Sequence, residues 1–182
     1  MAKRLTVDDI RGVVSIIPTP ATADASDFRV SDTLDLVEAK RVVRALIRDG
    51  VDALMTNGTL GEMATLTRSE WERFAVAVAE TVREEKPDLP LFIGATTLNT
   101  RDTVDRLRFL NDIGVRGALL GRPMWCRMDD ATIVDYHQAV ASAVPEMSFV
   151  LYDNPQAFKG SITNDVYRQL AENPQFVAIK AG

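Results

Sequence analysis

The sequence predicts an α/β fold with a parallel sheet, and three observations support this prediction. Short apolar runs alternate with longer stretches of helical periodicity along the whole chain. The apolar runs are typical of strands that are buried on both faces, as in a parallel sheet. The composition, with 46% hydrophobic and 26% charged residues among 182, is that of an ordinary globular protein.

The first half of the chain contains two predicted strands, each followed by a helix. The β-branched run VVSIIPTP (13–20) predicts a strand that its prolines end, and DALMTNG (52–58) predicts the second. Residues 31–50 predict a helix that stops at Gly50. Thr67–Glu70 (TRSE) has the form of a capping box and opens the next helix. The apolar positions of these two helices are Leu36, Ala39, Val43, Leu46 and Ile47, and then Trp71, Phe74, Ala75, Val78 and Val82.

The second half continues the same alternation. The run LFIGAT (91–96) predicts a strand, and residues 100–113 predict a helix with three inward apolar residues. The strand GALLG (117–121) leads through a loop to a helix at about 130–144. The inward residues of the helix at 100–113 are Val104, Leu107 and Leu110, and the remaining elements are a strand at 148–155, a short helix at 164–171 and a strand at 176–182.

Two parallel architectures fit this order, an open doubly wound sheet and a (β/α)8 TIM barrel. Unusual residues gather after several strands, as GTLGE (58–62), RPMWC (122–126), YDNP (152–155) and Lys180. Barrel enzymes draw catalytic residues from several strand ends, whereas an open sheet uses one switch point, so we predict the barrel. Because a barrel has eight units and about 250 residues, we expect this chain to supply about the first six βα units. We expect a single domain over residues 1–182, truncated after the sixth strand.

Composition and charge indicate the class of partner. The net charge is −5 and basic residues are interleaved with acidic ones, which argues against a nucleic-acid surface. No apolar run reaches the ~18 residues that a membrane-spanning helix needs. The N-terminal residues lack the apolar stretch of a secretory signal. With Cys126 as the sole cysteine, the sequence favours a cytoplasmic protein whose partners are small molecules or further copies of itself.

Lys180 and Tyr152 are the candidate catalytic residues. Lys180 ends an apolar strand, where apolar neighbours lower the pKa of an amine, so that it can form a Schiff base with a ketone. Alternatively, its ammonium group extends into solvent. Tyr152 ends the preceding strand, and a phenol beside an amine can shuttle protons. The alternative is a tyrosine that covers the core with its hydroxyl in water.

Five further residues are candidates for substrate binding. Gly58 allows a tight turn that leaves the backbone N–H groups of Thr59 and Leu60, and the Thr59 hydroxyl, available for a carboxylate. The motif is also compatible with an ordinary turn. Trp125 either stacks on a substrate ring or packs under its loop. Asn154 either donates a hydrogen bond to a substrate oxygen or sets the turn that follows it.

His137 is the only histidine, and its spacing from Ile133 and Val140 places it on an apolar helix face. We interpret it as structural. A zinc-dependent aldolase usually uses several histidines, and a Ser-His-Asp hydrolase needs one at the site, so the sequence favours neither. No metal site is predicted.

Three motifs in register resemble a known family. Gly58–Glu62 (GTLGE), Tyr152–Pro155 (YDNP) and Val177–Lys180 (VAIK) are similar to the pyruvate-dependent class I aldolases of the dihydrodipicolinate synthase and N-acetylneuraminate lyase superfamily. The resemblance covers the whole chain and implies a (β/α)8 barrel that assembles as a homotetramer. It also implies that Lys180 is the Schiff-base lysine and Tyr152 the proton shuttle, while Thr59 and Leu60 hold the pyruvyl carboxylate.

Other positions point to one branch of this superfamily. Dihydrodipicolinate synthases have a second threonine where Leu60 stands, and the synthases and neuraminate lyases tend to have an acidic residue where Ala181 stands. In contrast, TNGTLGEMATLT (56–67), GRPMW (121–125) and NPQAFKG (154–160) resemble the hydroxybenzylidenepyruvate hydratase-aldolases of aromatic hydrocarbon catabolism.

The resemblance to this branch implies a lyase that cleaves a trans-benzylidenepyruvate-type keto acid to an aromatic aldehyde and pyruvate. The covalent Schiff base would make any metal or organic cofactor unnecessary. Asn154 would position water or the C4 oxygen, and Trp125 would contact the aryl ring. Two alternatives stay open: another pyruvate-dependent aldolase, such as one for dihydrodipicolinate or a sugar keto acid, and a non-catalytic barrel relative or fragment.

Overall fold

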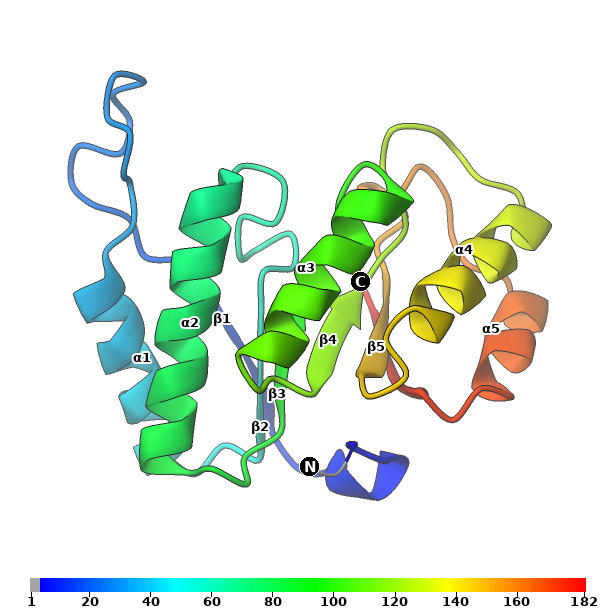
Figure 1. Cartoon of the computed structure of the whole chain (residues 1–182), viewed down its shortest axis with the longest axis horizontal. Coiled ribbons are helices and arrows are strands. Elements are labelled where there is room, and N and C mark those ends of the chain that lie inside the picture. The colour runs from blue at the N-terminus through cyan, green and yellow to red at the C-terminus, as the bar shows by residue number, and fades with distance from the viewer. Residues whose placement is uncertain (1–3) are drawn as a thin grey trace.

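The computed structural model describes residues 4–182, in which six parallel strands alternate with five α-helices (Figure 1). A short 3-10 helix at Val7–Asp9 precedes them. The strands are β1 (Val14–Ile17), β2 (Ala53–Thr56), β3 (Leu91–Gly94), β4 (Gly117–Leu120), β5 (Ser148–Asp153) and β6 (Phe176–Ala181). The helices are α1 (Leu36–Arg48), α2 (Arg68–Glu85), α3 (Thr100–Asp112), α4 (Asp130–Ser142) and α5 (Asn164–Ala171).

Every predicted strand and helix is present, and the largest differences lie at the first two. The strand predicted over 13–20 ends at Ile17, because the prolines that follow have no N–H to donate to a neighbouring strand. The helix predicted over 31–50 begins later, at Leu36, where the side chain of Asp35 accepts a hydrogen bond from the N–H of Glu38. Between them lies a long loop, joined to itself by an antiparallel bridge between Ala21 and Leu34.

The predicted capping box at the start of α2 is confirmed. The N–H of Thr67 donates to Glu70 Oε2 (3.0 Å), and the N–H of Glu70 donates to Thr67 Oγ1 (3.3 Å). The other carboxylate oxygen of Glu70 accepts from the N–H and the hydroxyl of Thr33. The Thr33 hydroxyl, together with the Thr67 hydrogen bonds, lowers the pKa of Glu70 to about 2. Glu70 therefore fastens the long β1–α1 loop to α2.

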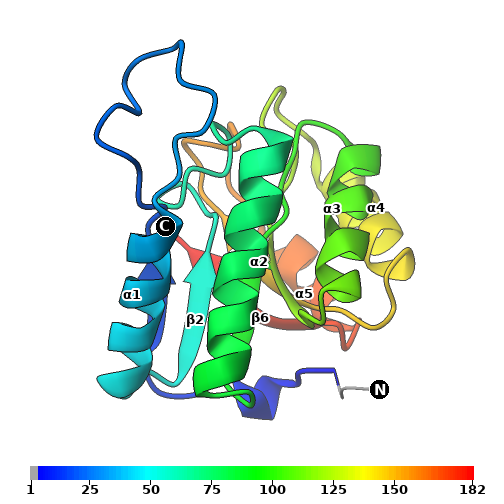
Figure 2. The same cartoon turned by 60° about the vertical axis from the view of Figure 1, so that its left-hand side comes forward.

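The strand order decides between the two predicted architectures. The order is β1-β2-β3-β4-β5-β6, and each neighbouring pair is parallel. A doubly wound sheet reverses its strand order and carries helices on both faces. Here the order never reverses, and α1 to α5 lie on one side of the sheet (Figures 1 and 2). The prediction of the first six βα units of a (β/α)8 barrel is confirmed.

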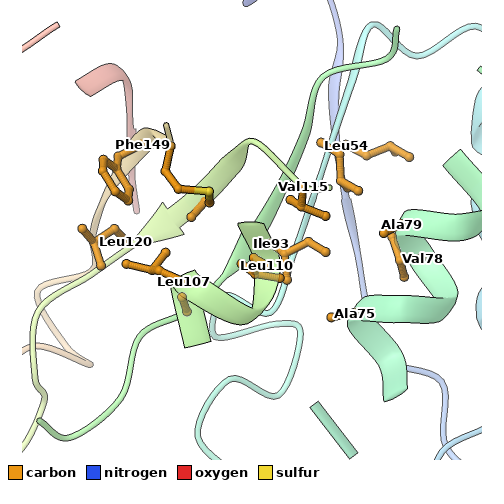
Figure 3. Packing of buried hydrophobic residues seen from close by; sticks show 14 of the residues in the cluster. Leu54, Ala75, Val78, Ala79, Ile93, Leu107, Leu110, Val115, Leu120 and Phe149 are labelled. Atoms are coloured by element: carbon orange, nitrogen blue, oxygen red, sulfur yellow. The ribbon is translucent and has the colours of Figure 1, made fainter. Parts of the chain in front are cut away.

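Two hydrophobic clusters lie on opposite faces of this curved sheet. The outer cluster joins the sheet to the helices and contains the residues that the helical periodicity placed inward, such as Val78 and Leu110 (Figure 3). The inner cluster contains no residue of α1 to α5 and includes Met55, Val150 and Tyr152. Successive strand residues alternate between the two clusters, as the two-residue period of a strand requires. Side chains that point inward at the carboxyl ends of the strands therefore lie on this inner face, where the candidate site is.

Candidate active site

The last two strands bring Lys180 and Tyr152 together. Their Cα atoms are partners in the register between β5 and β6, so both side chains point to the inner face. The Lys180 Nζ lies 4.6 Å from the centroid of the Tyr152 ring. Tyr152 is buried and Lys180 is half-buried. The amine is thus held against the tyrosine ring at the mouth of the inner face.

A shift in strand register determines which residue of β5 lies beside Lys180. The pairing passes from Phe149 with Phe176 directly to Val150 with Ala178, so that one residue of β6 is unpaired. Without this irregularity, the regular count would place Lys180 beside Asp153, with its side chain on the outer face. A β-bulge that re-aims a side chain is a common device next to functional sites.

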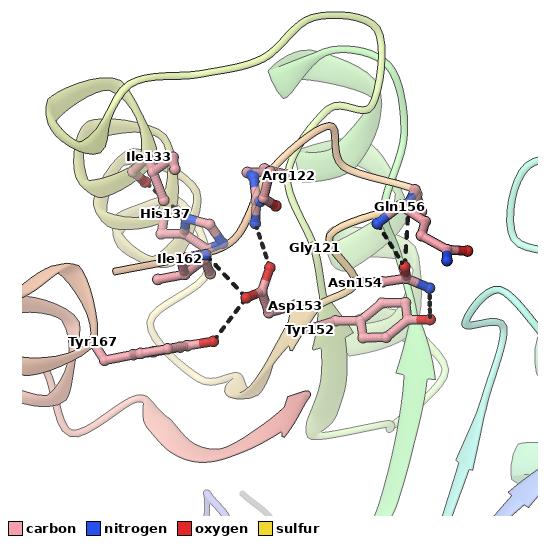
Figure 4. Close-up of polar contacts among 12 residues, drawn as sticks. Gly121, Arg122, Ile133, His137, Tyr152, Asp153, Asn154, Gln156, Ile162 and Tyr167 are labelled. Carbon is pink, nitrogen blue, oxygen red and sulfur yellow. Dashed lines mark hydrogen bonds and ion pairs between the residues drawn. The ribbon is translucent and has the colours of Figure 1, made fainter. Parts of the chain in front are cut away.

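The hydroxyl of Tyr152 forms hydrogen bonds with two other predicted site residues, Thr59 and Asn154. It lies 2.5 Å from Thr59 Oγ1, and the Thr59 N–H donates to it at 3.4 Å. Asn154 Nδ2 donates to the tyrosine hydroxyl at 3.3 Å (Figure 4). It also donates to Thr59 Oγ1 at 3.2 Å. The strand ends of β2 and β5 and the amine of β6 thus converge on one phenol.

These contacts change the acidity of Tyr152. Burial acts to raise the pKa of the phenol, but the hydrogen bonds from Asn154 and Thr59 and the positive charge of Lys180 together lower it below the ordinary value of 10.0. A phenol of lowered pKa next to an amine is suited to moving protons to and from groups bound at that amine.

The loop after β2 turns differently from the prediction. We expected Gly58 to provide the tight turn, but the left-handed residues are Asn57 (φ 52°) and Glu62 (φ 60°). Gly58 instead provides space, because a Cβ there would lie 3.2 Å from Leu119 and 3.6 Å from the Tyr152 ring. The glycine allows the backbone that carries Thr59 to approach the tyrosine.

Two predicted binding residues lie apart from this phenol. Leu60 is 63% exposed and Trp125 is 77% exposed, so the indole does not pack beneath its loop. Trp125 lines a groove of about 830 Å³. Two further residues of that groove, Met124 and Ala157, pack against the inner cluster that contains Tyr152. The groove therefore adjoins the Lys180 site.

Sequence reasoning missed a buried ion pair behind the site. Arg122 Nη1 donates to Asp153 Oδ1 at 3.0 Å, and both side chains are almost fully buried (Figure 4). A strand alternates its faces, so an inward Tyr152 sends Asp153 outward, where a buried carboxylate needs a cation. Arg122 lies two residues after Leu120, and Asp153 lies two residues after Leu151, the partner of Leu120 in the sheet. This equal spacing could have indicated the pair.

His137 lies where the sequence placed it, on the inward face of α4. It is fully buried, and its Nδ1 lies 2.7 Å from the carbonyl oxygen of Ile133. Burial lowers its pKa to about 4. Over residues 4–182, no three His, Cys, Asp or Glu side chains gather in a geometry suited to a metal ion. The helices of the same described part are too short or too polar to cross a membrane.

Comparisons with known proteins agree on one family. The profile of the Dihydrodipicolinate synthetase family matches residues 16–182. The trans-o-hydroxybenzylidenepyruvate hydratase-aldolase of Pseudomonas putida is 44% identical over 97% of this chain and 53% of its own length. The trans-2'-carboxybenzalpyruvate hydratase-aldolase of Nocardioides sp. (strain KP7) is 46% identical over 97% of this chain and 52% of its own length. The chain thus spans about half the length of the curated relatives it matches.

The solved structure of PhdJ bound to a substrate intermediate superposes with a TM-score of 0.93. It is 49% identical in sequence, and the match covers 98% of this chain and 54% of that one. The fold built from the strand order is therefore also the fold of this relative.

Proposed function

The chain belongs to the dihydrodipicolinate synthetase family, and on this premise we propose that it carries the catalytic lysine of a hydratase-aldolase. The proposed reaction cleaves a trans-benzylidenepyruvate-type aromatic keto acid to an aromatic aldehyde and pyruvate. The observation that carries the proposal is Lys180 against the ring of Tyr152, whose hydroxyl contacts Thr59 and Asn154. The names of the two hydratase-aldolases support the substrate class.

The first step is formation of an imine at Lys180. The neutral amine attacks the C2 ketone of the keto acid, and the carbinolamine loses water to give an iminium ion. Each stage moves a proton on or off the C2 oxygen or the nitrogen. Tyr152 is close enough to Lys180 to carry these protons, and the Thr59 hydroxyl can exchange a proton with the phenol across their 2.5 Å contact.

Hydration and cleavage follow from the iminium. The positive nitrogen withdraws electrons along the conjugated chain, so water adds at C4, the carbon that bears the ring, and loses a proton. This addition gives an enamine, and a proton taken up at C3 restores the iminium. Loss of a proton from the new hydroxyl breaks the C3–C4 bond, and the bonding electrons pass to the nitrogen as an enamine. The aldehyde leaves, C3 takes a proton, and water hydrolyses the iminium to free pyruvate and the amine. No cofactor is required in this scheme, because the iminium accepts the electrons.

The other predicted residues take binding roles in this proposal. The backbone of Thr59 and Leu60 would hold the carboxylate of the keto acid. Asn154 would position water or the C4 oxygen, and Trp125 would give the aryl ring an apolar face in the adjoining groove. We also propose a cytoplasmic homotetramer, in line with the family resemblance.

Turnover assays test this proposal. The full chain is incubated with 2-hydroxybenzylidenepyruvate, and release of the aldehyde and pyruvate is followed with Lys180→Arg and, as a matched control on α1, Lys40→Arg. We expect Lys180→Arg to lose all measurable cleavage and Lys40→Arg to keep it. Faster cleavage of polar hydroxy keto acids than of aryl ones would favour a different pyruvate aldolase. Equal activity of Lys180→Arg and the wild type would refute the proposal.

A further inference from the structure

Phe158 forms the wall behind the Tyr152 ring. The two rings meet edge to face, with centroids 5.4 Å apart and planes at 88°. Phe158 is fully buried, and its N–H donates to the carbonyl oxygen of Asn154 at 2.9 Å. The phenol is thus confined between Phe158 and the amine of Lys180.

Arg122 supports Phe158 in turn. Its guanidinium carbon lies 5.2 Å from the centroid of the Phe158 ring. The residue before it, Gly121, leaves room for that ring, since a Cβ at Gly121 would lie 2.3 Å from Phe158 Cζ. A larger residue at position 121 would displace the phenylalanine from Tyr152.

A buried network fixes the guanidinium itself. Arg122 donates to Asp153 and also to the carbonyl oxygen of Gly160. The second oxygen of Asp153 accepts from the N–H of Ile162 (2.9 Å) and the hydroxyl of Tyr167 (3.1 Å), as Figure 4 shows. The network thus ties the ends of β4 and β5 to the loop that begins at Asn154. Because a buried ion pair adds little net stability, stability alone is a weak reason for this arrangement.

We propose that Arg122 is a positioning residue: with Asp153 it holds Phe158 against Tyr152 and so fixes the phenol beside Lys180. The consequence for reaction rate rests on the proposed function, whereas the placement of the phenol does not. Misplacing a reacting group by about 1 Å costs on the order of 10²-fold in rate, so a loosened wall has a measurable effect.

Two variants loosen the wall in different ways. Phe158→Leu removes the edge contact and leaves the ion pair intact. Arg122→Lys keeps the charge near Asp153 but removes the flat, forked guanidinium that covers Phe158. The matched control is Arg29→Lys, in the exposed pair of Arg29 with Asp27. Because the two variants act at different residues, loss of the fold in one leaves the other to decide.

The tyrosinate absorbance of the full chain gives a readout that needs no activity. The sequence has three tyrosines. Burial raises the pKa of Tyr136 and of Tyr167 to about 12, whereas the pKa of Tyr152 lies below 10.0. The first tyrosine to ionise as the pH rises is therefore Tyr152. The second readout is the rate of imine formation with pyruvate, followed by borohydride trapping. The dissociation constant for pyruvate is measured separately for each variant.

We expect both wall variants to ionise Tyr152 at higher pH and to form the imine about tenfold more slowly or worse, with pyruvate affinity within about twofold. Arg29→Lys should match the wild type. Variants that melt at lower temperature but keep the wild-type titration and imine rate would overturn the proposal and leave Arg122 a structural residue. If the wild type forms no imine, the proposed function fails, and the titration alone still decides whether Arg122 positions the phenol.

Discussion

Thr59 contacts the phenol of Tyr152 through two of its groups. Its hydroxyl and its N–H both contact the tyrosine oxygen, and each contact lowers the pKa of Tyr152. The ionised phenol is therefore populated at lower pH than that of free tyrosine. A tyrosine with a lowered pKa can therefore act as a base over a wider pH range than free tyrosine.

Replacing Thr59 should move the pH dependence of imine formation. In Thr59→Val the hydroxyl is lost while burial continues to raise the pKa, so the pKa of Tyr152 rises and the limb of the profile that depends on ionised tyrosine moves to higher pH. Thr59→Ser keeps a hydroxyl and serves as the control. The measurement is the trapping rate with pyruvate against pH. A Thr59→Val profile that coincides with that of the wild type would remove Thr59 from the proton path.

Trp125 should act on the aryl end of the substrate alone. The indole lines the groove beside the site, and within residues 4–182 it makes no hydrogen bond or ring contact with Lys180 or Tyr152. Trp125→Ala is therefore expected to lower kcat/KM for benzylidenepyruvate by about tenfold while pyruvate trapping changes less than about twofold. The exposed aromatic Phe28, in a distant loop, provides the control Phe28→Ala. Equal losses for both substrates would contradict the assignment.

The capping box of α2 starts the helix and also fixes a neighbouring loop. Glu70 also holds Thr33, so one carboxylate connects α2 to the loop between β1 and α1. The folded-state pKa of about 2 lies below the ordinary 4.5. The unfolded chain therefore binds the proton more readily than the folded one as pH falls.

This difference predicts an acid-sensitive contribution to stability. The contribution of Glu70 is fully present above about pH 4.5 and is lost as pH falls toward about 2. Glu70→Gln should destabilise the fold by about 1–2 kcal/mol at neutral pH and should lose less stability on acidification than the wild type. Urea unfolding at pH 7 and pH 3 measures both values, with Glu72→Gln, at a partly exposed position of the same helix, as control. The same acid loss in Glu70→Gln as in the wild type would show that the carboxylate is not responsible.

Periodicity and capping signals predicted every strand and helix, because helix starts and buried strands are determined locally. The inward faces of α2 and α3, the stop at Gly50 (φ 89°) and the Thr67 cap all follow from a few neighbouring residues. The predicted ends of β1 and α1 differ from the structure because Pro18 ends β1 and Asp35 caps α1, and the residues between them form a loop with its own bridge. Propensity rules do not capture such a long-range contact.

The candidate site was predictable only in part, for a similar reason. Lys180 and Tyr152 could be placed on adjacent strands, since consecutive barrel strands are neighbours. The irregular register that puts them side by side falls where the rings of Phe149 and Phe176 meet, and no local pattern indicates it. The partnership of Arg122 with Asp153 likewise joins residues 31 positions apart.

The two edge strands of the six-stranded sheet are β1 and β6. The outer side of β6 presents Ile179, which is 52% exposed. Edges of this kind favour pairing with other chains. The 182-residue chain is therefore expected to associate as its concentration rises, and Ile179→Thr should reduce that association. Light scattering measures it, with exposed Val37→Thr on α1 as control; concentration-independent scattering of the wild type would contradict the expectation.

All of the proposed chemistry depends on an imine between Lys180 and a keto acid. Borohydride reduction in the presence of pyruvate, followed by mass spectrometry of the peptides, tests it most directly. We predict a reduced pyruvyl adduct on Lys180 in the wild type and none on that peptide in Lys180→Arg. A folded protein that shows no adduct at Lys180, or one whose adduct lies on another lysine, would contradict the account.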